Sequence, residues 1–123
     1  LVLIDPPFEK PDDFARCADA IALIRNRFRA GIVAVWYPIK HRTPVRTFYT
    51  ALQDAGIRDM LACEFLLRPP VDPSRLNGCG LLVVNAPFGF EDEACDILQA
   101  LATGLRSPDA EGIQINIERL AEE

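Results

Sequence analysis

The chain has 123 residues, half of them hydrophobic and a quarter charged, which fits one globular unit or part of one and excludes two full domains, disorder and low-complexity scaffolds. Its 13 Lys and Arg against 18 Asp and Glu give a formal net charge of −5, so any contact with nucleic acid must be local rather than a matter of bulk charge. The uncharged apolar runs are shorter than the roughly 20 residues of a membrane-spanning helix, so we expect a soluble, cytoplasmic protein without membrane contact. Four well-separated cysteines and a single histidine predict free thiols and no metal site.

The first third of the chain predicts a strand, a helix and a second strand. Residues 1–4 form a continuous apolar run that ends at a double proline, which is typical of a strand buried on both faces. Residues 32–36 form a second β-rich run, so we expect a βαβ crossover. Because the chain begins with Leu1 inside an apolar run, we expect it to be part of a longer protein. The helix between the strands should start at Asp12 or Asp13 and bury residues spaced by three and four, namely Phe14, Cys17, Ala18, Ile21, Ile24 and Phe28.

The remainder predicts two further helices and three further strands. A helix should start at Thr43 and Pro44 and end at Gly56, a strand should follow over 60–67, and 73–80 should be an exposed loop. The all-apolar run 81–84 predicts a central strand, and alternating isoleucines over 113–117 predict a half-exposed edge strand. Strands alternating with helices predict one α/β domain with a mostly parallel sheet and flanking helices. The buried helix faces should be Val45, Phe48, Leu52 and Ala55, and then Ala94, Ile97, Leu98, Leu101 and Leu105, with Ser107 and Pro108 ending the last helix.

Asp5, Pro6, Pro7 and Phe8 form a segment that packing alone does not explain. They directly follow a predicted strand, where α/β proteins place their ligand sites. The prolines have no N–H groups, so their carbonyl oxygens remain free as acceptors. Asp5 and the Pro6 carbonyl can accept both N–H bonds of an exocyclic amino group while Phe8 stacks on the heterocycle. From composition alone, an Asx-type turn with Phe8 as a core residue is an equally good interpretation.

This segment resembles the Asp/Asn-Pro-Pro-aromatic motif of amino-N6 and amino-N4 methyltransferases that use S-adenosylmethionine. Segments at 35–39, 55–58, 76–81 and 84–88 follow in the order found in the RlmJ-type 23S ribosomal RNA adenine-N6 methyltransferases, and the resemblance runs from residue 1 to about residue 90. Two departures occur. Phe8 stands where the family usually has Tyr, and Ala86 and Phe88 stand where it usually has Pro and Trp.

The resemblance implies the carboxyl-terminal half of a Rossmann-like methyltransferase fold, starting at its fourth strand, with the glycine loop for the methyl donor upstream of Leu1. It implies that Asp5 is the catalytic residue and also contacts S-adenosylmethionine, and that Pro6, Pro7 and Phe8 bind the substrate. The reaction implied is methyl transfer to N6 of a flipped adenine in 23S ribosomal RNA, without a metal ion.

Two other segments are candidates for function. Lys40, Arg42 and Arg46, together with His41, form the densest basic cluster and are candidate contacts for an RNA phosphate, although such clusters are more often solvated turns. They should share a sheet edge with Asp5 if the strands are parallel. The segment 85–88 is a weaker copy of the first motif, but Asn85 is better explained as a turn cap.

Rival functions stay open at this point. The Asp-Pro-Pro-aromatic motif does not select the polymer, so a DNA adenine-N6 or cytosine-N4 methyltransferase is the alternative enzyme. A non-catalytic α/β signalling domain with Asp5 as phosphoacceptor is a different class, although no acidic pair for its metal ion is evident. An interaction module that associates through an exposed sheet edge is a third possibility.

Overall fold

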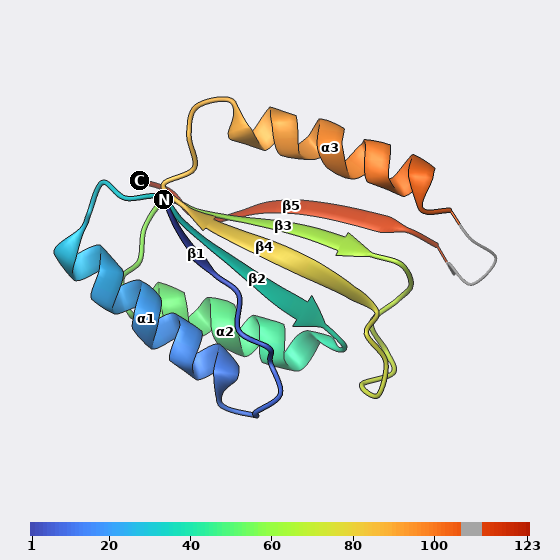
Figure 1. The fold of residues 1–123 in the computed structure, drawn as a ribbon, viewed down its shortest axis with the longest axis horizontal. Coiled ribbons are helices and arrows are strands. Elements are labelled where there is room, and N and C mark those ends of the chain that lie inside the picture. The colour runs from blue at the N-terminus through green and yellow to red at the C-terminus, as the bar shows by residue number, and fades with distance from the viewer. Residues whose placement is uncertain (107–111) are drawn as a thin grey trace.

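The computed structural model describes residues 1–106 and 112–123, which form one five-stranded sheet with helices on both faces (Figure 1). Helices α1 and α2 lie together on one face, and α3 lies on the other. The helices are α1 (Asp13–Arg27), α2 (Arg42–Asp54) and α3 (Phe90–Gly104). The strands are β1 (Val2–Ile4), β2 (Val33–Ile39), β3 (Met60–Leu66), β4 (Gly78–Val84) and β5 (Gln114–Ala121).

The strand order is β1-β2-β4-β3-β5, and only the pair β1–β2 is parallel. Strand β4 runs antiparallel to both β2 and β3, and β5 runs antiparallel to β3, so the prediction of a mostly parallel sheet is wrong. The physical reason is the connection between β3 and β4, which contains no helix and returns the chain directly beside the strand it has left. Because β1, β2 and β3 still run in the same direction, their carboxyl ends meet at one edge of the sheet.

The main core lies between the sheet and the helices α1 and α2. In β2 every second residue points into it, from Val33 to Ile39, as the period of a strand requires. Helix α2 contributes the predicted residues Val45, Phe48 and Leu52, all nearly inaccessible to solvent. The predicted face of α2 is thus confirmed, except that Ala55 follows the helix end and is exposed.

Two predicted buried surfaces are largely exposed. Strand β1 pairs only with β2, and Leu3 is 66% exposed, so it is an edge strand and not one buried on both faces. Helix α3 buries Ala94 and partly buries Leu98, but Ile97 is 58% exposed and Leu101 and Leu105 are exposed too, because the helix packs mainly against β3 and β5. The predicted helix end at Ser107 and Pro108 lies outside the described residues.

Strand β4 begins earlier than the sequence predicted, within the expected loop. Gly78 and Gly80 indicated a turn, yet both lie in the strand. Glycine is required at these two strand positions because the neighbouring residues leave no room for a side chain. A Cβ atom at Gly80 would stand 2.2 Å from the ring of Tyr37, and one at Gly78 would stand 2.3 Å from the Phe65 carbonyl oxygen. The central position of β4 and the half-exposed edge position of β5 are as predicted. Within the described residues, no helix has both the length and the hydropathy that a bilayer crossing requires.

Candidate active site

Asp5 directly follows β1 and is exposed at the edge of the sheet where the strands β1, β2 and β3 end. Within residues 1–106 and 112–123, no side-chain hydrogen bond or ion pair involves its carboxylate, so the Asx-type turn considered from the sequence is not formed there. Pro6 is half-buried and Pro7 is exposed. The carboxylate is therefore open to a ligand, and the two prolines that follow it limit the conformations of the corner.

Phe8 has a φ of 51°, a left-handed backbone conformation that only a few non-glycine residues adopt and that is often found at functional sites. Its ring packs against Phe14, with ring centroids 4.9 Å apart, and against the edge of Trp36 at 6.2 Å. Phe8 is half-buried rather than enclosed in the core. The structure thus holds a fixed aromatic ring, partly accessible, three residues after an exposed carboxylate.

Two cavities flank this corner, and Pro6, Pro7 and Phe8 line their walls. The Phe8 cavity has a volume of about 190 Å³, and its wall is formed by Phe8, Lys10, Pro11, Phe14, Pro38, Lys40, His41, Pro44 and Pro73. The second cavity, of about 390 Å³, lies beside α1 and is lined by Ile4, Pro6, Pro7, Glu9, Lys10, Asp13, Arg16, Cys17 and Ala20. Asp5 lines neither cavity, but it immediately precedes Pro6 of the second cavity and lies three residues before Phe8 in the sequence.

The basic cluster predicted from the sequence is divided by the structure. The parallel pairing of β1 and β2 brings Lys40 and His41 to the same sheet edge as Asp5, where both line the Phe8 cavity. Arg42, the first residue of α2, instead binds Glu64, with its Nη1 2.9 Å from both carboxylate oxygens. Arg46 and Arg42 line a different cavity of about 690 Å³ beside Glu64. Lys40 and His41 are therefore the members of the cluster that face the motif.

Glu64 is a buried carboxylate that sequence reasoning missed. It lies in the middle of β3, is 4% exposed, and accepts hydrogen bonds from Arg42, from the Tyr49 hydroxyl at 2.6 Å and from Asn116 Nδ2 at 3.2 Å. The hydroxyls of Tyr49 and Tyr37 are also hydrogen-bonded to each other. Burial, above all, raises the pKa of both tyrosines well above the ordinary value, so both hydroxyls stay protonated. A lone glutamate within the otherwise apolar run of residues 60–66 was the available signal.

The segment 85–88 lies at the opposite end of the sheet from Asp5, because β4 runs antiparallel to β2. Asn85 has φ at 57°, and its Nδ2 donates to the carbonyl oxygens of Arg29 at 2.7 Å and of Gly31 at 2.9 Å. Its side chain therefore fixes the turn before β2, in agreement with the interpretation as a turn cap. The resemblance of this segment to the first motif does not bring it to the same site.

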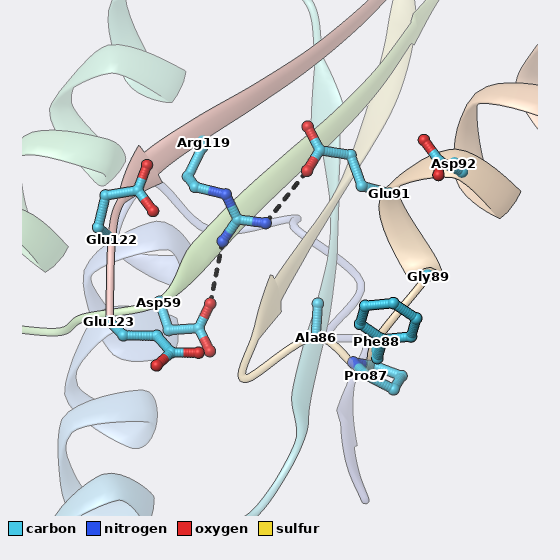
Figure 2. A pocket seen from close by; sticks show the side chains of 10 residues that line it. All are labelled: Asp59, Ala86, Pro87, Phe88, Gly89, Glu91, Asp92, Arg119, Glu122 and Glu123. Carbon is cyan, nitrogen blue, oxygen red and sulfur yellow. Dashed lines mark hydrogen bonds and ion pairs between the residues drawn. The ribbon is translucent and has the colours of Figure 1, made fainter.

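Figure 2 shows the cavity beside this segment, of about 680 Å³, where Phe88 is fully exposed. The guanidinium of Arg119 bridges Asp59 at 3.0 Å and Glu91 at 3.2 Å. Three more carboxylates line the cavity, so its charge disfavours a phosphate backbone; they belong to Asp92, Glu122 and Glu123. In the part of the chain that the structure describes, no cluster of three or more His, Cys, Asp or Glu side chains could hold a metal ion.

An α/β sheet with an exposed acidic, double-proline and aromatic corner at a strand's carboxyl end is consistent with a methyltransferase-like fold. Comparison with known proteins gives the same class: the family model for "Ribosomal RNA large subunit methyltransferase D, RlmJ" matches residues 1–116. The chain belongs to the RlmJ family, as its motifs predicted.

Individual relatives agree. The chain is 36% identical over 105 residues to "Ribosomal RNA large subunit methyltransferase J" of Haemophilus influenzae, covering 85% of this chain and 37% of the relative. It is 33% identical over 105 residues to the Escherichia coli protein of the same name, covering 85% and 38%. A crystal structure of a Legionella pneumophila protein superimposes with a TM-score of 0.81 at 26% identity, covering 95% of this chain and 42% of that one. The chain thus spans less than half the length of these relatives.

Proposed function

We propose that this chain is the part of an S-adenosylmethionine-dependent 23S ribosomal RNA adenine-N6 methyltransferase that presents the substrate amine. The observation that supports this most strongly is the exposed Asp5-Pro6-Pro7-Phe8 corner at the end of β1 in a chain of the RlmJ family. The names of the two bacterial relatives point to ribosomal RNA of the large subunit as substrate. The cytoplasm, where such RNA is found, is the proposed place of action.

In this proposal, Asp5 and the Pro6 carbonyl accept hydrogen bonds from the N6 amino group, and Phe8 supports the plane of the adenine. The lone pair of N6 is delocalised into the ring, so acceptors that favour a more tetrahedral nitrogen increase its nucleophilicity and fix its direction of attack. S-adenosylmethionine supplies the methyl group on a sulfonium. N6 gains one bond to carbon as the sulfur–methyl bond breaks and the donor leaves as a neutral thioether, and N6 loses one proton, which the Asp5 carboxylate takes up. Stacking on Phe8 offsets part of the cost, a few kcal/mol, of flipping the base out of its helix.

The methyl donor needs more than Asp5 to hold it. This sequence has no Gly-x-Gly-x-x-Gly segment, so we propose that the glycine loop and the acidic residue for the ribose belong to a part of the protein outside these 123 residues. The exposed edge of β1, with Leu1 and Leu3 accessible, is the proposed place of association with that part. On its own, the chain of 123 residues should bind S-adenosylmethionine weakly or not at all, and calorimetry that finds micromolar affinity would contradict this.

The test of the proposed function is methyl transfer by the complete natural protein. Radiolabelled S-adenosylmethionine is supplied with protein-free 23S ribosomal RNA or with duplex DNA, and the digested products are separated by mass. The proposal predicts N6-methyladenosine from the RNA and no label in the DNA. Label in DNA alone would identify the rival amino-methyltransferase, and no label in either would reject the methyltransferase assignment.

A further inference from the structure

The Phe8 cavity differs in charge from the other three cavities described in residues 1–106 and 112–123. Its lining contains Lys10, Lys40 and His41 and no carboxylate. Each of the other three has at least two carboxylates in its wall. In a chain with a net charge of −5, a cavity lined only by basic and apolar residues indicates an anionic ligand.

The basic groups of this cavity are available for binding. Within the described parts of the chain, no ion pair or side-chain hydrogen bond engages the ammonium groups of Lys10 and Lys40 or the imidazole of His41. Their backbones are anchored nevertheless. The N–H of Lys10 donates to Asp13 Oδ2 at 3.0 Å, and the carbonyl of Lys40 accepts from Nδ2 of the fully buried Asn77. The backbones of both lysines are thus held in place, and among the described residues their ammonium groups have no carboxylate partner that an anion would have to displace.

The rest of the wall is apolar and rigid. Two aromatic rings, Phe8 and Phe14, pack on each other, and four proline rings come from the turn before α1, from β2, from the start of α2 and from the loop before β4. A free phosphate ion would not need such a surface. A nucleotide would, because its phosphate binds cations while its sugar and base pack on aromatic and apolar side chains.

We propose that the Phe8 cavity holds the sugar and phosphate of the nucleotide next to the target adenine, an inference that rests on the proposed function. The target base itself must reach Asp5, which does not line this cavity. The occupant of the cavity is therefore the nucleotide next to the target adenine in the RNA chain. Phe8 is three residues from Asp5, at most about 11 Å along an extended polypeptide, so an RNA chain whose flipped base reaches Asp5 passes over Phe8. Lys10, Lys40 and His41 bind the phosphate, and Phe8 separates the two nucleotide positions.

The test removes the two lysine charges in the complete natural protein, as Lys10→Gln with Lys40→Gln. The matched control is Arg27→Gln with Arg29→Gln, which removes two exposed charges between the end of α1 and the start of β2, at the end of the sheet opposite Asp5. Two quantities are measured for each protein: the KM for protein-free 23S ribosomal RNA, and the slope of log affinity for that RNA against log salt concentration. The lysine variant should raise KM several-fold with little change in kcat, and its slope should be shallower by about 0.7 for each phosphate charge that the protein no longer neutralises. The control should leave both quantities unchanged.

The outcomes separate this inference from the proposed function. Methylation with unchanged KM and salt slope in the lysine variant would overturn the inference and leave the proposed function standing. A shallower slope for the lysine variant alone, in a protein that methylates no RNA, would support the cavity as an RNA site and reject the proposed function. Equal effects of the lysine variant and the arginine control would also overturn the inference, because the weaker binding would then reflect bulk charge.

Discussion

Removing Arg42 should destabilise the fold because it leaves the carboxylate of Glu64 buried without its counter-charge. Glu64 is 4% exposed, and the Arg42 side chain is 27% exposed. Breaking a buried pair by removing one partner costs about 3–5 kcal/mol. Since Arg42 is partly solvated and Glu64 keeps its bonds from Tyr49 and Asn116, we expect Arg42→Ala to lower the free energy of unfolding by about 3 kcal/mol, the lower end of that range.

The assay is urea unfolding followed by circular dichroism, with Arg46→Ala as the matched control. Arg46 is exposed on the same helix and forms no ion pair within the described residues, so its removal should change the free energy of unfolding by at most about 0.5 kcal/mol. Glu64→Gln removes the uncompensated charge, so adding it to Arg42→Ala should recover part of the missing stability. A decrease below about 0.5 kcal/mol for Arg42→Ala, or strictly additive effects in the double variant, would refute the reasoning.

Two further predictions concern the core. Burial raises the pKa of the Cys63 thiol to about 11. Its alkylation by iodoacetamide at pH 8 should therefore be slow in the folded protein and should accelerate as the pH rises toward that pKa. Mass spectrometry that finds Cys63 labelled as fast in the native as in the urea-unfolded protein would contradict this. Gly80→Ala should cost at least about 1–3 kcal/mol, because the new methyl group would meet the buried ring of Tyr37. The control is Gly104→Ala in the last turn of α3, which should be neutral or stabilising because the space around its Cβ position is open. Equal Tm values for the two variants would show that Tyr37 does not restrict Gly80.

The sequence predicted the elements well because their signals are local. The boundaries of α1 and α2 follow from apolar spacing and turn residues, and Asp5 is identified by the prolines beside it. The direction of β4 could not be predicted in the same way. Whether a strand runs parallel or antiparallel depends on which neighbour it joins, and Gly78 and Gly80 indicated a loop where the packing of Tyr37 and Phe65 requires glycine.

The candidate site was predictable in its motif but not in its surroundings. Lys10 is separated from Lys40 along the chain, and only the pairing of β1 with β2 brings their turns to one cavity. Arg42 belongs to the same basic run as Lys40, but its partner Glu64 is 22 residues away in sequence, so its structural role could not be seen from the run itself. Similarly, the second proline-aromatic segment resembles the first, but the antiparallel direction of β4 places it at the other end of the sheet.

The central claim is that the Asp5 carboxylate acts on the substrate amine, and the most direct measurement is the kcat of the Asp5→Ala variant on protein-free 23S ribosomal RNA. Asp5 is exposed and forms no side-chain bond within the described residues, so the Tm should be unchanged while kcat falls by roughly 10²–10⁴. Asp19→Ala, which removes an exposed carboxylate from α1, should leave both quantities unchanged. An Asp5→Ala protein that is folded and methylates the RNA at the wild-type rate would contradict the account.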